Sequence, residues 1–176
     1  MTKNILFAGF GGQGVLFAGR VLANAGLCDG YEVSWLPSYG PETRGGTSNC
    51  SVVISERAIG SPLVTVSDVL VAMNTPSYDE FVCNVAPGGI LIMDLSLIDR
   101  DSGRDDLDEY RIPATMHAES IGLEGLSNMI LLGKLFGVLG MFDDDIIEEA
   151  VKRSVSSERL GLIKRNLAAL KEGQSL

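Results

Sequence analysis

Residues 5–15 read Ile-Leu-Phe-Ala-Gly-Phe-Gly-Gly-Gln-Gly-Val, and this stretch decides the fold. The four apolar residues before Gly9 form a continuous run that predicts a strand buried on both faces, as in a parallel sheet. After the glycines, apolar residues recur at helical spacing, at Val15, Ala18, Leu22 and Ala25. Gly30 then ends the predicted helix, as a glycine at this position commonly does. The chain therefore opens as a strand, a glycine-rich turn and a helix.

The same two periodicities alternate along the rest of the chain. Strands are predicted at 32–35, 47–55, 69–73 and 90–93, with a short edge strand at 112–113. The strand at 47–55 is expected to turn back near Glu56 into a short antiparallel partner ending at Pro62. Helices are predicted from Thr75, whose hydroxyl suits an N-cap, and over 127–141, 143–154 and 158–172. This order predicts an α/β, three-layer, Rossmann-like fold with a mostly parallel sheet, an antiparallel hairpin and C-terminal helices. We expect one domain over 1–176.

Two segments are predicted to be loops. Residues 36–46 contain two prolines and three glycines, a composition typical of a loop. Residues 99–109 carry six acidic residues and two arginines, which favours a solvated excursion from the fold.

Charge and composition exclude several classes of protein. The 176 residues include 14 Lys and Arg against 23 Asp and Glu, and the formal net charge is −9. Nucleic acids and anionic membrane surfaces are bound through basic patches, so neither is expected as a partner. The N-terminal residues have no basic flank or cleavage site of a secretory signal. Three scattered cysteines form no disulfide framework, which favours a reducing compartment and a cytoplasmic location.

Few side chains could carry out chemistry. The cysteines are Cys28, Cys50 and Cys83, and the one histidine is His117. An iron–sulfur cluster usually takes about four thiolates, and zinc sites and Ser-His-Asp triads depend on histidine. We therefore expect no catalytic residue and no metal site, and we expect His117 to lie on the surface without a role. The composition favours a component of a larger enzyme over a self-sufficient catalyst.

Residues 9–14 fit the pattern G-x-G-x-x-G between a strand and a helix. In this context glycines let a phosphate approach the backbone, and the helix N-terminus offers unpaired N–H donors. An NAD site also needs an acidic residue at the end of the second strand, where this chain has Ser34 and Trp35. The pattern thus disfavours NAD and leaves two interpretations open: a phosphate-bearing ligand, or a tight turn needed only for packing.

Arg44 is the one basic residue between Arg20 and Arg57, and Gly45 and Gly46 follow it. A guanidinium in such a loop can bind a carboxylate or phosphate through two parallel hydrogen bonds. The alternative is an ordinary salt bridge, for instance to Glu42.

The predicted helix over 129–142 has a single charged residue, Lys134, before Phe142. It is too short to span a bilayer, which takes about 20 apolar residues. A helix that is apolar all round is buried, and Gly133, Gly137 and Gly140 would allow a close backbone approach. We expect part of this helix to contact another subunit, with burial against the sheet alone as the alternative.

Several motifs together resemble one known family. They are residues 9–15, residues 37–47 (Pro-Ser-Tyr-Gly-Pro-Glu-Thr-Arg-Gly-Gly-Thr), Ile59–Pro62, Ala72–Asn74, Pro87–Gly89 and the helix from Asn128 to Gly140. In this order they are similar to the gamma subunit of 2-oxoacid:ferredoxin oxidoreductases, the family that acts on 2-oxoglutarate, 2-oxoisovalerate or pyruvate. The resemblance covers nearly the whole chain and is weakest in 99–109.

The resemblance implies a multi-subunit enzyme of class EC 1.2.7. Such enzymes decarboxylate a 2-oxoacid on thiamine diphosphate, pass electrons through iron–sulfur clusters to ferredoxin and deliver the acyl group to coenzyme A. Thiamine diphosphate, Mg and the clusters belong to the alpha, beta and ferredoxin-like delta subunits. The gamma subunit packs on these partners near the coenzyme A site and is not active alone.

Two hypotheses follow. The first is a gamma subunit that does not bind thiamine, in an enzyme for 2-oxoglutarate, with a branched-chain 2-oxoacid or indolepyruvate as alternative substrates and a homodimer as a further possibility. The second is a free-standing nucleotide-binding α/β protein. For the first hypothesis the cofactor-binding residues are expected to be Gly9, Gly11, Gly12, Gln13, Gly14, Arg44, Gly45 and Gly46.

Overall fold

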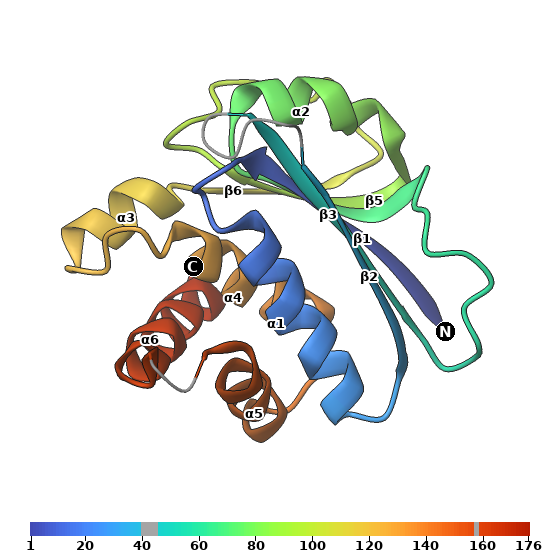
Figure 1. Ribbon diagram of the computed structural model, residues 1–176. Helices are drawn as coiled ribbons and strands as arrows, with labels where there is room; N and C mark the ends of the chain where they lie inside the picture. The colour runs from blue at the N-terminus through green and yellow to red at the C-terminus, as the bar shows by residue number, and fades with distance from the viewer. Residues whose placement is uncertain (40–45, 157–158) are drawn as a thin grey trace.

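The computed structural model of the chain describes residues 1–39, 46–156 and 159–176. Over these ranges, six α-helices and a short 3-10 helix surround one six-stranded sheet (Figure 1). The strands are β1 (Thr2–Phe10), β2 (Glu32–Tyr39), β3 (Thr47–Ser55), β4 (Ser67–Ala72), β5 (Val85–Asp94) and β6 (Asp108–Ile112). The helices are α1 (Val15–Cys28), α2 (Thr75–Phe81), η1 (Val82–Asn84), α3 (Ala114–Ser120), α4 (Ser127–Leu139), α5 (Asp144–Ser154) and α6 (Gly161–Ser175).

The sheet is mostly parallel, as predicted, and its strand order is β2-β3-β1-β4-β5-β6. Strands β1, β4, β5 and β6 run parallel to one another. Strand β3 is antiparallel both to β1 and to β2, so it lies between the two strands that α1 connects. The first strand–helix–strand unit is therefore split by an inserted antiparallel strand.

Helices cover both faces of the sheet, which confirms the three-layer arrangement. Figure 1 shows α2 on one face and the larger group of α1, α4, α5 and α6 on the other. In β1, Ile5 and Phe7 join the hydrophobic cluster on the side of α1, and Leu6 and Ala8 join the cluster on the side of α2. The continuous apolar run thus forms a strand buried on both faces, as its sequence predicts.

Strand β2 is longer than predicted. Its ladder with β3 continues to the pair Tyr39↔Ser48, so residues 36–39 belong to the strand and not to a loop. The loop prediction relied on Pro37, and it failed because β2 is at the edge of the sheet. The outer side of an edge strand pairs with no other strand, so a proline without an N–H is tolerated there.

The predicted return strand between Glu56 and Pro62 is wrong, since residues 56–66 form no strand. The antiparallel partners of β3 are β1 and β2 instead. Its register with β1 runs without a break from Thr2↔Ser55 to Phe10↔Thr47. β2 directly precedes β3 in the chain, so the antiparallel hairpin that the sequence predicts is formed by β2 and β3. The pairing of β3 with β1, which is distant in sequence, is not revealed by local turn signals.

Differences also occur in the second half of the chain. The edge strand is β6, and it begins inside the segment predicted to be a solvated excursion. Helix α3 was not predicted, because seven residues are too few to show helical periodicity. The last helix begins at Gly161 and not at residue 158, whereas the predicted α4 and α5 are confirmed to within two residues.

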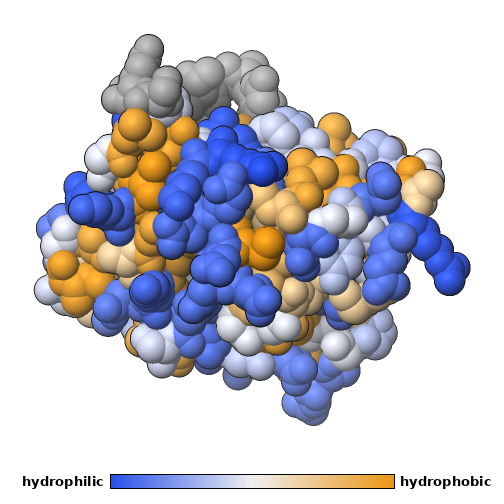
Figure 2. Space-filling view, turned by 90° about the horizontal axis from the view of Figure 1, so that it is seen from below, coloured by the Kyte–Doolittle hydropathy of each residue, from blue (hydrophilic) through white to orange (hydrophobic). Residues whose placement is uncertain are grey.

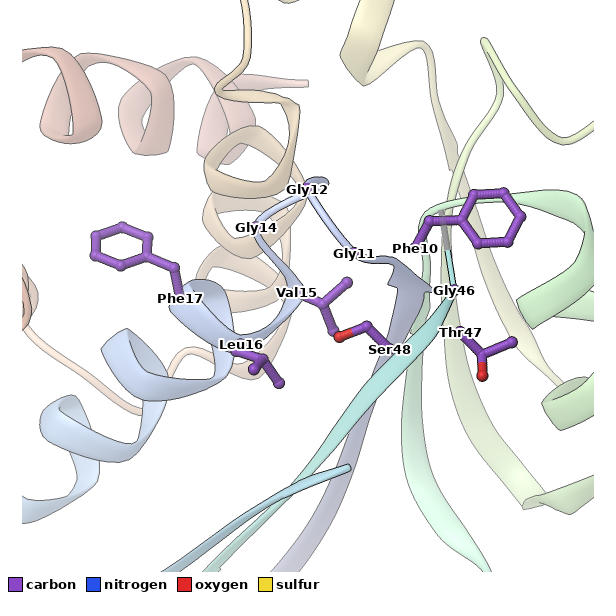
Figure 3. Close-up of a pocket in the computed structure, with 10 residues that line it drawn as sticks. All are labelled: Phe10, Gly11, Gly12, Gly14, Val15, Leu16, Phe17, Gly46, Thr47 and Ser48. Atoms are coloured by element: carbon purple, nitrogen blue, oxygen red, sulfur yellow. The ribbon is translucent and has the colours of Figure 1, made fainter. Parts of the chain in front are cut away.

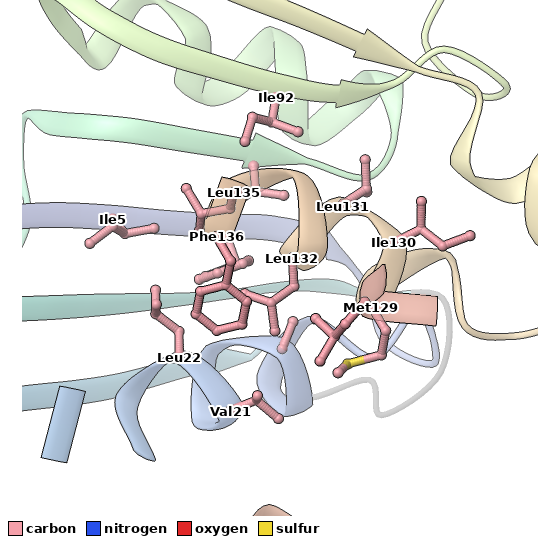
Figure 4. Packing of buried hydrophobic residues seen from close by; sticks show 14 of the residues in the cluster. Ile5, Val21, Leu22, Ile92, Met129, Ile130, Leu131, Leu132, Leu135 and Phe136 are labelled. Atoms are coloured by element: carbon pink, nitrogen blue, oxygen red, sulfur yellow. The ribbon is translucent and has the colours of Figure 1, made fainter. Parts of the chain in front are cut away.

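Helix α4 is buried by elements of its own chain. Figure 4 shows its side chains, including Leu132 and Phe136, packed between the sheet and α1. On its other side α4 crosses α6 at close range. A Cβ atom on Gly133 would overlap the backbone of Leu170, and one on Gly173 would overlap the backbone of Ile130. The close approach that the sequence predicts at Gly133 is thus made within the chain, to α6, and not to another subunit.

The outer surface of the helical layer is mixed. Seen from below, it presents many hydrophilic side chains with hydrophobic areas between them (Figure 2). Exposed large hydrophobic residues on α3 and around the start of α6 include Met116, Leu160 and Leu162. In the described ranges, no helix combines the length and the apolar character needed to cross a membrane.

The α4–α6 contact leads to a stability prediction. Gly133→Ala should lower the free energy of unfolding by about 1–3 kcal/mol, because the added methyl group must push two helix backbones apart. Gly137→Ala is the matched control on the same helix, where the new Cβ would lie 3.7 Å from Gln174, an ordinary contact. It should stabilise the chain by about 0.5–1 kcal/mol through helix propensity. Urea unfolding of both variants measures the difference, and equal effects would contradict the close crossing.

Candidate functional site

The glycine-rich turn between β1 and α1 is the centre of the candidate site. Gly12 has a φ of 104° and Gly14 a φ of 74°, both in the region that favours glycine. Nothing lies within 4 Å of the position that a Cβ of Gly12 would take, so the top of the turn is open. At Gly14 a Cβ would overlap the side chain of Asn128. We call residues 11–14 the glycine arch.

The two glycine-rich segments of the sequence meet at this arch. The N–H of Gly11 donates to the carbonyl of Gly46 across 2.9 Å. Gly46 comes directly before β3, and the β1–β3 register brings it level with the end of β1. The structure thus brings together the predicted site residues of the first segment and Gly46. Arg44 and Gly45 lie outside the described residues.

The side chain of Gln13 faces the protein. Its Oε1 accepts hydrogen bonds from the N–H of Phe10 at 2.7 Å and from Nδ2 of Asn74 at 2.8 Å. Its Nε2 donates to the carbonyl of Met73 at 2.9 Å. Met73 and Asn74 follow β4, so this amide ties the arch to the end of the neighbouring strand. The sequence singled out Gln13 for contact with a cofactor, but its amide is already used within the protein.

Asn74 joins the same network from α2. Its Oδ1 accepts the N–H of Ser77 at 2.9 Å, which makes Asn74 the N-cap of the helix in place of the predicted Thr75. Gly9, another predicted site residue, is the next-to-last residue of β1 and lies beneath the network. A Cβ there would lie 2.8 Å from Oε1 of Gln13, so Gly9 is needed for packing.

Asn128 holds the arch from a third direction, and sequence reasoning did not select it. It is buried at the start of α4, and its Nδ2 donates to the carbonyl of Gly14 at 3.1 Å. In the sequence, the one sign of a special role for Asn128 is that it is a polar residue at the beginning of an otherwise apolar helix. The contact itself joins residues 114 positions apart, which no local pattern could indicate.

The arch presents a group of unpaired backbone donors. Gly11 donates to Gly46, and Gln13 donates to the carbonyl of Phe10. Within the ranges described, no residue accepts from the N–H groups of Gly12, Gly14 and the first turn of α1, Val15 to Phe17. These groups also lie at the positive end of the helix dipole. The geometry is therefore able to bind an anionic group such as a phosphate.

A hollow of about 400 Å³ opens beside these donors. It is lined by Phe10, Gly11, Gly12, Gly14, Val15, Leu16, Phe17, Gly46, Thr47 and Ser48, which Figure 3 labels. Backbone atoms and apolar side chains dominate, and its described lining contains no charged side chain. Gly12 also borders a smaller hollow of about 240 Å³ on the side of α3 and α4. The described part of the site thus offers N–H donors and apolar contact.

The topology disfavours a dinucleotide. In doubly wound folds the ligand occupies the crevice at the carboxyl ends of two neighbouring strands. Here the amide of Gln13 bridges that crevice between β1 and β4. The acidic residue of an NAD site also belongs to a strand adjacent to β1, but β2 is separated from β1 by β3. This chain therefore lacks both the open crevice and the strand arrangement that a free-standing NAD-binding protein needs.

Among the described residues, the remaining reactive side chains offer no reactive group at the arch, although the Sγ of Cys50 donates to the carbonyl of Val15 at 3.6 Å. Burial raises the pKa of the Cys50 thiol to about 12, so it stays protonated at neutral pH. His117 is half-buried and not a bare surface residue, because its Nε2 lies 3.0 Å from Oε2 of Glu172. In the portion of the chain that the structure covers, no group of three His, Cys, Asp or Glu side chains could hold a metal ion.

Comparison with known proteins identifies the family of the chain. Residues 4–176 match the family described as pyruvate ferredoxin/flavodoxin oxidoreductase. The ketoisovalerate oxidoreductase subunit VorA of Methanothermobacter thermautotrophicus is 42% identical over 171 residues, which are 96% of this chain and 35% of VorA. The 2-oxoglutarate synthase subunit KorC of Methanothermobacter marburgensis is 38% identical over 183 residues, which are 100% of this chain and 97% of KorC. The chain therefore spans about a third of VorA but nearly all of KorC.

Among solved structures, one match is to a gamma subunit of keto/oxoacid ferredoxin oxidoreductase from Geobacter sulfurreducens. The TM-score is 0.82 and the identity is 27%, with 98% of this chain and 96% of that chain covered. The likeness therefore extends over nearly the whole of the fold described above.

The two positive-φ glycines of the arch should respond differently to substitution. Gly12→Ala adds a methyl group in open space and should cost about 1–2 kcal/mol from backbone strain alone. Gly14→Ala should cost more, because its methyl group also overlaps Asn128. Adding Asn128→Ala to Gly14→Ala should make the two losses less than additive. Urea unfolding of the four variants tests this, and a greater loss for Gly12→Ala than for Gly14→Ala would contradict the described arch.

Proposed function

This chain belongs to the pyruvate ferredoxin/flavodoxin oxidoreductase family, and from that premise we propose that it is the gamma subunit of a multi-subunit 2-oxoacid:ferredoxin oxidoreductase. The observation that carries the proposal is the family match over residues 4–176, which leaves almost no part of the chain for another function. The enzyme would oxidatively decarboxylate a 2-oxoacid to an acyl-CoA, with ferredoxin as the electron acceptor. Its cytoplasmic location is part of this proposal.

The partners in the proposed complex are alpha, beta and ferredoxin-like delta subunits. They would hold thiamine diphosphate, Mg and the iron–sulfur clusters, which supply the decarboxylation and electron-transfer chemistry. The exposed hydrophobic residues on α3 and near the start of α6 suit contact with such partners. A homodimer of this chain is a further arrangement that the sequence allows.

Coenzyme A is the ligand that we propose for the glycine arch. Its diphosphate suits the unpaired N–H groups of Gly12, Gly14 and the first turn of α1. The extended pantetheine arm of coenzyme A suits the apolar hollow of about 400 Å³ beside these N–H groups. This chain would bind and orient the acyl acceptor through its backbone, without moving a proton itself. Arg44 and Gly45 stay predicted contributors, and Arg44 would supply the cation for the anionic ligand.

We propose 2-oxoglutarate as the substrate. The support is the likeness to KorC, a 2-oxoglutarate synthase subunit, which this chain matches over 97% of KorC's length. The higher identity to VorA keeps a branched-chain 2-oxoacid as the leading alternative, and indolepyruvate follows. The residues that distinguish these acids are expected on other subunits, so the comparison must be made with the assembled enzyme.

The experiment is reconstitution of this chain with the partner subunits, with turnover measured by reduction of a viologen dye. The chain alone should show no coenzyme A-dependent turnover with any 2-oxoacid, and the complex should prefer 2-oxoglutarate. Gly12→Val should raise the KM for coenzyme A by about tenfold or more, because the side chain covers the donors of the arch.

Gly30→Val is the matched control for this substitution. Gly30 has a φ of 84° and open space around it, but it lies beyond the opposite end of α1. Its strain is similar, and it should leave the KM for coenzyme A unchanged. Turnover by the chain alone would refute the assignment as a subunit. The same KM in both variants would refute the binding role of the arch.

A further inference from the structure

We propose that Gln13 is a positioning residue, which sets the affinity for the acyl acceptor by fixing the glycine arch to the end of β4. The inference rests on the proposed function, since it concerns the coenzyme A bound at the arch. It assigns Gln13 a role different from direct contact with the ligand, which the sequence pattern suggested.

The bonding capacity of the Gln13 amide is closely matched to its surroundings. The oxygen accepts two hydrogen bonds, from Phe10 N–H and from Asn74 Nδ2, and the NH2 group donates one to Met73. The three distances lie between 2.7 and 2.9 Å, within the normal range. Among side chains that are uncharged at neutral pH, only an amide offers an oxygen with two acceptor sites and a donor at this reach. Gln13 therefore acts as a brace that no apolar residue of similar size can replace.

The brace acts on the part of the arch that is otherwise held by a single backbone hydrogen bond, from the N–H of Gln13 to the carbonyl of Phe10. Gly11 is fixed by Gly46, and the carbonyl of Gly14 is fixed by Asn128. Between them, Gly12 has no neighbour within 4 Å of its Cβ position, and glycine permits a wide range of backbone angles. Gln13 is the one remaining residue of the arch, and its side chain leads inward. Without the brace the unpaired N–H groups would lose their common orientation, and a ligand would have to restore it on binding.

The brace also limits the space for a ligand on one side of the arch. The Gln13 amide occupies the crevice between β1 and β4, where doubly wound folds bind their ligands. Gln13 lines the smaller hollow of about 240 Å³, and the larger hollow of about 400 Å³ opens beside Gly12, Val15 and Gly46. Loss of the brace should therefore weaken binding of coenzyme A without changing the KM for the 2-oxoacid, whose site is expected on other subunits.

Three variants test the brace in the assembled enzyme. Gln13→Leu removes all three bonds at similar volume. Gln13→Glu keeps the acceptor but faces the carbonyl of Met73 with an oxygen. Asn74→Asp keeps the oxygen that caps α2 and removes the donor to Gln13, so it acts on the brace without changing the arch. Gln174→Leu, on α6, is the matched control for a glutamine outside the arch.

Gln13→Leu should raise the KM for coenzyme A by about tenfold to a hundredfold, with kcat at saturating coenzyme A and the KM for the 2-oxoacid unchanged within about twofold. Asn74→Asp should shift the same KM in the same direction by a smaller factor. For Gln13→Glu, the KM for coenzyme A divided by the wild-type KM at the same pH should fall as the pH falls. The reason is that a protonated carboxyl can again donate a hydrogen bond to the carbonyl of Met73. A purely structural role would show no such recovery.

The outcomes separate the brace from the proposed function. If Gly12→Val raises the KM for coenzyme A but Gln13→Leu behaves like Gln174→Leu, the arch binds coenzyme A and the brace is refuted. If Gly12→Val has no effect, the proposed function of the arch fails. Should Gln13→Leu not fold, the Gln13→Glu ratio decides, and a ratio independent of pH overturns the inference.

Discussion

The unbroken antiparallel ladder between β1 and β3 is the constraint on which the rest of the structure depends. Its register pairs Thr2 with Ser55 at one end and Phe10 with Thr47 at the other. Because the last pair is fixed, Gly46 arrives beside Gly11, and the two glycine-rich segments are joined by one hydrogen bond. A shift of one residue would turn the buried face of β3 outward and separate these segments. The inserted strand thus serves both the core and the candidate site.

The arch that results works through its backbone. Three contacts from different elements hold it: Gly46 before β3, the end of β4 through Gln13, and α4 through Asn128. Between these contacts the N–H groups at the start of α1 have no acceptor in the described chain. Preorganised donors of this kind can bind an anion without rearrangement. Such a site fits the proposed role of a subunit that would orient the acyl acceptor for chemistry performed by its partners.

Much of this could be predicted from sequence, because the relevant signals are local. The apolar run before Gly9 and the helical period after Gly14 specify β1, α1 and the turn between them. The insertion of β3 could not be predicted, since pairing partners are chosen by the whole sheet and not by the strand itself. The hydrogen bonds of the Gln13 side chain could not be predicted for a similar reason. Its partners Met73 and Asn74 lie 60 and 61 positions away, and only the topology places them beside the arch.

The most direct test of this account is hydrogen–deuterium exchange in the assembled enzyme, read on the peptide that covers residues 9–20, with and without coenzyme A. The unpaired N–H groups of the arch and of the first turn of α1 should exchange more slowly once coenzyme A is bound, because its diphosphate accepts from them. Peptides from the far end of α1 should not change. Unaltered exchange of residues 9–20 at saturating coenzyme A would contradict the account.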